Sequence, residues 1–364
     1  MWHKMEMCRR NWLFFFLAIV TLGLLHLTGC TIKNMNETRS SEPEYANIPG
    51  VYLGSFHGTS SSSIKLFNEI GKGVAISASY LNWGSGFNNG FLNSNAYVGR
   101  SSFLTWEFMP GSGQKVQAYE GRVLEAITDG LYDDYVTSWA EGMRDFDKPV
   151  FLRFGHEMNG DWYPWSGVKN GGGTLDGYGS PDLADGPERY VDAYRHIHDI
   201  FSQAGADKVM WVWCPNAPFD AMTQALGSWN KPAAYYPGDD YVDWLCFDGY
   251  NWGASAFGQQ FNAKWTSFED IFAGSYADLQ AINPSKPIII GEFASTEEGG
   301  DKAAWIRDAF DDIRNKFPQI RAIIWFHIAK ETDWRINSSD ASLKAYAEAA
   351  ADDYWLSEWP GMLP

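Results

Sequence analysis

The stretch PVFLRFGHEMNG, which occupies residues 149–160, joins a short apolar run to a polar end. Residues 287–294, PIIIGEFA, repeat this arrangement, and the two runs lead to Glu157 and Glu292. A carboxylate directly after such a run cannot stay charged inside a core without a large desolvation cost, so it must face a cleft or a partner. We therefore interpret both runs as buried strands, each of which delivers a carboxylate to a cleft.

Short runs rich in β-branched and aromatic residues recur along the chain, each followed by a polar loop and a helical pattern. This alternation is typical of repeated βα units, and near-continuous apolarity fits parallel strands covered on both faces. One connecting helix is predicted over residues 187–204, because it opens with a proline and ends before Gly205. The predicted strands are residues 50–57, 73–80, 101–108, 149–156, 208–214, 242–249, 287–293 and 320–327.

Eight such units predict a (β/α)8 TIM barrel of the α/β class, in which catalytic groups lie at the carboxyl ends of strands. Glu157 follows the fourth predicted strand and Glu292 ends the seventh, so the two carboxylates should point across the barrel mouth. Hydrolysis of a glycosidic bond needs such a pair, since one carboxyl group protonates the leaving oxygen while the other meets the oxocarbenium-like carbon. For either glutamate alone, the alternative is a structural ion pair at a strand end.

The beginning of the chain has the features of an export signal. Basic residues precede an apolar run of 16 residues, 12–27, which is shorter than the roughly 20 residues needed to cross a bilayer. The small residues before Cys30 look like a bacterial lipoprotein processing site, although an uncleaved anchor helix is the alternative. We expect a signal peptide over residues 1–29, a polar tether over 30–46 that starts at a lipidated Cys30, and one catalytic domain over 47–364.

Charge and composition exclude several classes of function. The formal net charge of −17 opposes binding to nucleic acid or to an anionic membrane surface, and it favours a neutral substrate over a polyanion. The sequence has no metal-ligand spacing and no nucleotide-binding loop, so no cofactor is expected. Cys214 and Cys246 could form a disulfide in an oxidising compartment, but their strand-like apolar surroundings favour two buried thiols.

Aromatic residues gather in polar loops, as in DWYPW at residues 161–165 and YNWG at 250–253. Flat rings in such loops can stack on the apolar faces of sugar rings. By barrel position, Tyr250 could donate a hydrogen bond to Glu292, and Trp325 could form the floor of a sugar subsite, although core packing is an equal alternative for Trp325. His156 adjoins Glu157 and could orient it or bind a sugar hydroxyl.

The segment HEMNGDWYPW, residues 156–165, resembles glycoside hydrolase family 26, a retaining (β/α)8 family best known for β-mannanases. The resemblance continues through YYPGDDYVDWLCFDGYNWG, IIIGEFAS and IIWF, from about residue 50 to 335. It implies an enzyme with Glu157 as acid/base and Glu292 as nucleophile. It also implies that His156 and Trp162 bind near the cleavage point, that Tyr250 is the nucleophile's partner, and that Trp325 is a sugar platform.

The resemblance leaves the substrate open. Pro164 interrupts the aromatic run that many mannanases of the family carry, and the loop of residues 166–186 is long and glycine-rich. We expect an endo-acting enzyme on β-1,4-mannan, with mixed-linkage β-1,3-1,4-glucan or β-1,3-xylan as alternatives within the family. A glycan-binding lipoprotein without turnover is the alternative from another class, although loss of either glutamate would have favoured it more.

Overall fold

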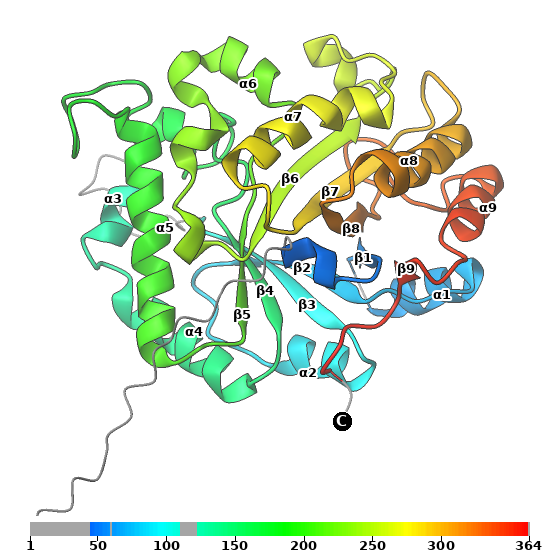
Figure 1. The fold of residues 1–364 in the computed structure, drawn as a ribbon, viewed down its shortest axis with the longest axis horizontal. Helices are drawn as coiled ribbons and strands as arrows, with labels where there is room; N and C mark the ends of the chain where they lie inside the picture. Colours follow the sequence, from blue (N-terminus) through cyan, green and yellow to red (C-terminus); the bar gives the residue numbers. More distant parts are fainter. Residues whose placement is uncertain (1–43, 59, 110–121, 363–364) are drawn as a thin grey trace, which may run out of the picture. The chain divides into compact units, whose positions relative to one another are not determined.

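The computed structural model describes residues 44–58, 60–109 and 122–362 (Figure 1). Cys30 and the predicted signal peptide lie outside the described residues. Among the helices that are described, none combines the length and the apolar character that crossing a membrane requires.

The described strands form a closed barrel, because β1 pairs with both β2 and β8. Every strand pairing in this barrel is parallel. The (β/α)8 prediction is confirmed, and each predicted strand corresponds to one observed strand. The eight barrel strands are Val51–Phe56 (β1), Ile76–Asn82 (β2), Ser101–Glu107 (β3), Val150–Phe154 (β4), Val209–Trp213 (β5), Trp244–Asn251 (β6), Ile288–Ser295 (β7) and Ile320–Phe326 (β8).

Helices separate successive strands and lie outside the barrel (Figure 1). The helix predicted over residues 187–204 is the longer α5, which ends in a left-handed cap at Gly205. The α-helices are Ser60–Ile70 (α1), Gly90–Tyr97 (α2), Val123–Thr128 (α3), Asp133–Phe146 (α4), Asp185–Ala204 (α5), Phe219–Leu226 (α6), Phe268–Ile282 (α7), Lys302–Lys316 (α8) and Asp340–Ala349 (α9).

Two sets of side chains hold the barrel together. Along β4, Val150 and Leu152 belong to the large cluster under the helices, whereas Phe151 belongs to a smaller one with residues from the other strands. This alternation indicates that the smaller cluster fills the barrel interior. Near the chain end, the short strand Trp355–Leu356 (β9) pairs with β1, and Trp359 packs on the Phe151 ring at 4.9 Å. The barrel interior is therefore a packed core. Because β9 and Trp359 lie at one end of the barrel, the opposite end is open to hold a site.

Cys214 and Cys246 form a disulfide, so the expectation of two free thiols was wrong. Cys214 follows β5 directly and Cys246 lies in β6, the neighbouring strand of the sheet. Both side chains belong to the interior cluster, and their Cα atoms are 4.3 Å apart. Apolar surroundings alone could not reveal this, because they are the same for paired and unpaired cysteines.

Candidate active site

Glu157 lies in a tight turn that begins where β4 ends. Its backbone φ is 53°, in the left-handed region, and Gly155, two residues earlier, has a φ of 58°. Such a conformation costs a non-glycine residue about 1 kcal/mol or more, so the surrounding contacts must hold it. One of them is the hydrogen bond that the Glu157 amide donates to the Cys214 carbonyl at 2.7 Å. The turn thus fixes Glu157 beside the end of β5.

The Glu157 carboxyl group is mostly enclosed, with 8% of the residue exposed. Trp162, from the same loop, donates its indole N–H to Oε2 of Glu157 at 2.7 Å. Burial, together with the nearby charge of Glu292, raises the pKa of Glu157 to about 8, against the smaller opposing effect of the indole hydrogen bond. A carboxyl group in this environment carries a proton at neutral pH and can donate it.

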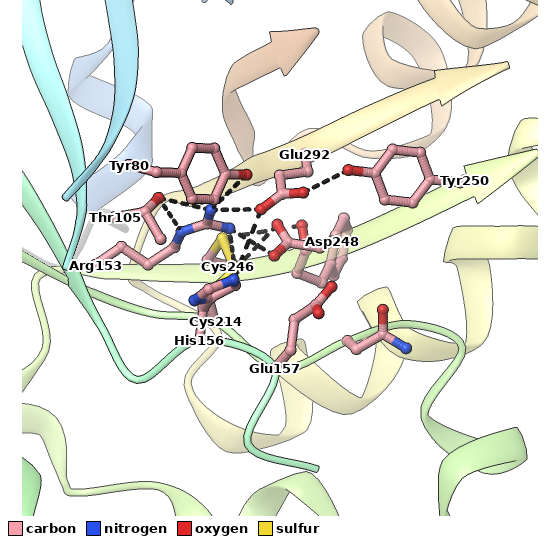
Figure 2. A network of polar contacts seen from close by, with 12 residues as sticks. Tyr80, Thr105, Arg153, His156, Glu157, Cys214, Cys246, Asp248, Tyr250 and Glu292 are labelled. Carbon is pink, nitrogen blue, oxygen red and sulfur yellow. Dashed lines mark hydrogen bonds and ion pairs between the residues drawn. A yellow bond between two sulfur atoms is a disulfide. The ribbon is translucent and has the colours of Figure 1, made fainter. Parts of the chain in front are cut away.

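Glu292 lies within β7 and accepts hydrogen bonds from Arg153 and Tyr250 (Figure 2). Arg153 donates Nη2–H to Oε1 at 2.5 Å, and the Tyr250 hydroxyl donates to Oε2. These two contacts fix the orientation of the Glu292 carboxyl group. The prediction that Tyr250 is the hydrogen-bond partner of Glu292 is therefore confirmed as a contact, and Arg153 is a second partner that sequence reasoning missed.

Arg153 is the centre of a buried polar network beneath Glu292. Its guanidinium also binds Oδ2 of Asp248 at 2.5 Å and the Thr105 hydroxyl at 2.7 Å, and the Tyr80 hydroxyl lies 3.4 Å from Nη2 (Figure 2). The arginine is 1% exposed. A signal for this network was present in the sequence, because a charged residue inside the apolar run VFLRF needs a buried counter-charge.

A backbone irregularity makes room for this network. The register between β6 and β7 shifts so that Asp248 aligns with Glu292, which leaves Gly291 as an extra residue in β7. A β-carbon at Gly291 would lie 2.7 Å from Oδ1 of Asp248 and 2.9 Å from Nη1 of Arg153. Only glycine lets the strand pass this close to the ion pair, which explains the glycine directly before Glu292.

His156 is fully buried and directly precedes Glu157 in the sequence. Its Nε2 is 3.0 Å from the Tyr163 hydroxyl and 4.0 Å from Oε1 of Glu292. Burial, reinforced by the positive charge of Arg153, lowers the pKa of His156 well below its usual value, so the ring is neutral. A neutral ring that supports Tyr163 is a positioning group, and a sugar contact by His156 stays a prediction.

Trp325 does not have the position predicted for it. The side chain is fully buried, and its indole N–H donates to the Trp334 carbonyl at 2.8 Å. Its ring packs on Phe293 at 4.9 Å, inside the cluster under the helices. A ring with no exposed face cannot support a sugar, so the core alternative holds for Trp325. By contrast, Trp162 is 44% exposed beside Glu157 and is free to take that role.

A further carboxyl group, that of Glu107 at the end of β3, is close enough to interact electrostatically with Glu292. Burial raises its pKa, opposed by the positive charges of Arg153 and Lys330. Lys330, which follows β8, is 64% exposed at its side chain and lies 2.8 Å from Glu331. The charged rim of the site is therefore built from β3 and β8 in addition to the two strands that carry the glutamates.

Among the residues that the structure describes, two groups of side chains have the donor atoms that a metal ion would need. In one, ligand atoms of His156, Asp248 and Glu292 lie within 4.8 Å of one another. Arg153 already supplies a positive charge between the two carboxylates there, so a cation would have to displace it. In the other, Cys214 and Cys246 are joined with Asp248 close by, and a disulfide sulfur is a poor metal ligand. We propose no metal at either group.

The fold and the site define a class of protein, namely (β/α)8 barrels with two glutamates at the ends of the fourth and seventh strands. The family model described as "Glycosyl hydrolase family 26" matches residues 114–273. The matched region contains the motif at residues 156–165, so the resemblance to this family that the motif predicts is confirmed.

Individual relatives agree with this assignment. Endoglucanase H of Acetivibrio thermocellus is 39% identical over 82% of this chain and 30% of its own length. A mannan endo-1,4-β-mannosidase of Bacillus subtilis is 28% identical over 55% of this chain and 44% of its own length. This chain thus spans less than half of either relative. Among solved structures, mannanase Man26 of Bacillus subtilis has the same fold, with a TM-score of 0.59 and 20% identity over 87% of this chain and 92% of that one.

Proposed function

We propose that this protein is a retaining endo-β-glycanase that hydrolyses a neutral β-linked polysaccharide. The observation that carries the proposal is the contrast between its two glutamates. Glu157 has a raised pKa and can hold a proton, whereas Glu292 receives hydrogen bonds from Arg153 and Tyr250. An acid and a charged nucleophile are the two groups that a double displacement at a glycosidic carbon requires.

The mechanism that follows has two steps. Glu157 protonates the glycosidic oxygen while a Glu292 oxygen attacks the anomeric carbon, so the C–O bond to the leaving sugar breaks and a glycosyl ester of Glu292 forms. Glu157, now ionised, then takes a proton from water, and the water oxygen displaces Glu292. Two inversions at one carbon give net retention, so the first product from a β-glycan should be the β-anomer.

For the substrate, we propose β-glucan first and mannan second. The glucan assignment is supported by the higher identity to a protein named Endoglucanase H, 39% against 28% for the Bacillus subtilis mannosidase. It also agrees with Pro164, which interrupts the aromatic run typical of mannanases. Mannan is supported by the resemblance of the motif around Glu157 to a family best known for mannanases, and β-1,3-xylan is a further candidate.

A panel of polysaccharides tests both parts of the proposal. Purified residues 31–364 would be assayed on lichenan, barley β-glucan, galactomannan, unsubstituted mannan and β-1,3-xylan, with products separated by length. We expect oligosaccharides of mixed length from a glucan, as endo action gives. Release of single sugars only would contradict endo action. If every substrate were bound but none were cut, the protein would be a glycan-binding protein and the proposed activity would be wrong.

We also propose that the protein is exported and anchored by a lipid at Cys30. The proposal is supported by the basic and apolar residues before Cys30, and the Cys214–Cys246 disulfide suits an oxidising compartment outside the cytoplasm. Incorporation of a labelled fatty acid by expressing cells tests it. The wild-type protein should carry the label, whereas Cys30→Ser, which keeps the apolar run of residues 12–27 but lacks the lipid-accepting thiol, should carry none. Equal labelling of both would contradict the anchor at Cys30.

A further inference from the structure

A series of aromatic rings leads away from Glu292 into the loop that follows β6. The Tyr250 ring, whose hydroxyl binds Glu292, lies 5.7 Å from the Trp252 ring. Trp252 in turn is stacked on Phe257 at 5.2 Å and meets the edge of Phe261 at 5.4 Å. Phe257 and Phe261 are therefore each separated from Tyr250 by one intervening ring, that of Trp252.

Those two outer rings are unusually exposed. Phe257 is 40% and Phe261 is 50% exposed, and their centroids are 6.0 Å apart. Leaving apolar surface in water is unfavourable by about 25 cal/mol for each Å². Paired exposed rings that are continuous with an enclosed site suggest a surface that is covered when the site is occupied.

The loop holds these rings by hydrogen bonds of its own backbone. Buried Ser255 accepts bonds at Oγ from Gly258 N at 3.1 Å and at its carbonyl from Gln259 N at 2.9 Å. Ala263 N donates to the Gly258 carbonyl at 3.0 Å, and the whole turn, Gly258–Phe261 (η7), is a 3-10 helix. A loop fixed in this way presents its rings without the entropy cost of ordering them on binding.

We propose that Phe257 and Phe261 form a distal sugar-binding subsite, on which a pyranose ring of the same polysaccharide chain stacks while Glu157 and Glu292 act on another linkage. The inference rests on the proposed function. The apolar face of a pyranose ring matches an aromatic face, and the exposed Gln259 and Gln260 beside the rings offer amide groups to sugar hydroxyls. The occupant is the substrate chain because the rings continue the series that starts at Tyr250.

Chain-length dependence is the test. Phe257→Ala, Phe261→Ala and the double variant would be compared with the wild type on a ladder of oligosaccharides cut from the preferred polysaccharide. For the double variant we expect kcat/KM to fall about tenfold, or about 1.4 kcal/mol, on substrates long enough to reach the platform. On the shortest cleavable substrate it should change less than about twofold. The KM should account for most of the loss.

Tyr97→Ala is the matched control. Tyr97 is 86% exposed at the end of α2, just before β3 begins, so it lies at the end of the barrel opposite to the glutamates. Its loss should leave kcat/KM unchanged on every substrate. A general effect of removing an exposed ring would appear in this variant too.

The outcomes separate the inference from the proposed function. A wild-type protein without activity on any glycan would end the proposed function itself. An active wild type with a double variant that is equally impaired on short and long substrates, or not impaired at all, would overturn the subsite alone. If the double variant instead changed the oligomeric state by light scattering, with unchanged kinetics, the rings would belong to a protein interface and the subsite would be wrong.

Discussion

Glu157 and Glu292 are the same residue type in two differently built regions of one barrel. At the end of β4, Glu157 lies in a turn with a positive φ and accepts a hydrogen bond from the Trp162 indole. In β7, Glu292 lies in a regular strand next to a bulge and is held by Arg153 and Tyr250. The comparison teaches that the chemistry of each carboxyl group is set by its neighbours, which keep one protonated and supply the other with donors.

Removal of either carboxyl group should have the largest effect. Glu157→Gln and Glu292→Gln should each lower kcat on polysaccharide by about a thousandfold or more, because both groups take part in the double displacement, one as acid and base and the other as nucleophile. Circular dichroism should show an unchanged fold. Activity within tenfold of wild type in both variants would mean that neither residue is part of the chemistry.

Azide distinguishes the two roles. With an activated aryl glycoside and Glu157→Ala, azide should displace Glu292 from the glycosyl ester and give a β-glycosyl azide. With Glu292→Ala, azide should replace the missing nucleophile in a single displacement and give the α-glycosyl azide. The product anomers, read by NMR, would contradict the assignment if they were exchanged.

The support beneath Glu292 can be broken separately. Arg153→Met would leave Asp248 and Glu292 buried with no counter-charge, which should lower the free energy of unfolding by about 3–5 kcal/mol. Arg314→Met is a matched control, because the Arg314–Asp352 pair is partly exposed, with side chains 36% and 53% exposed, and should contribute about 1 kcal/mol or less. Urea denaturation measures both. Equal losses would show that the buried network has no special weight.

Features of the fold and the site that depend on local sequence could be predicted, whereas features that depend on how strands pair could not. Alternating apolar runs and loops predict all eight strands, and the motif at residues 156–165 selects Glu157 and, with the seventh strand, Glu292. The Cys214–Cys246 bond and the bulge at Gly291 depend instead on the register between neighbouring strands, which a single sequence does not contain.

Trp325 shows the same limit on a single side chain. Successive residues of a strand point to opposite faces, and barrel position alone did not tell which face Trp325 takes. Its neighbour Phe326 packs on the Tyr250 ring at 5.7 Å, next to the site, whereas Trp325 points into the cluster under the helices. Both residues are buried, and barrel position alone could not tell which of them contacts Tyr250.

A smaller change tests the close packing on the Glu292 side. Gly291→Ala would place a methyl group within 3 Å of the ion pair and of the Cys246 sulfur, so it should destabilise the protein by about 1–3 kcal/mol. It should also lower kcat by displacing Glu292. Gly274→Ala is the control. A β-carbon at Gly274 would meet nothing within 4 Å, and Gly274 lies in α7, where alanine is favoured over glycine. A Gly291→Ala variant as stable and active as Gly274→Ala would refute the packing argument.

The finest test moves the pKa of Glu157 in opposite directions. Glu292→Gln removes a nearby negative charge that raises this pKa, so the pKa should fall below about 8. Trp162→Phe removes a hydrogen bond that lowers it, so the pKa should rise. Carbon-13 NMR of labelled glutamate carboxyl groups measures both, with Glu157→Gln identifying the resonance and Phe261→Ala as the control that should leave it unmoved.

The same pKa sets the pH dependence of activity. Because Glu157 must carry its proton to act as an acid, kcat/KM should fall as the pH rises through about 8 in the wild type. In Trp162→Phe, whatever activity is left should persist to higher pH. If the alkaline limb followed neither the NMR titration of Glu157 nor the loss of the indole donor, another group would be the acid, and the contrast between the two glutamates would need a different cause.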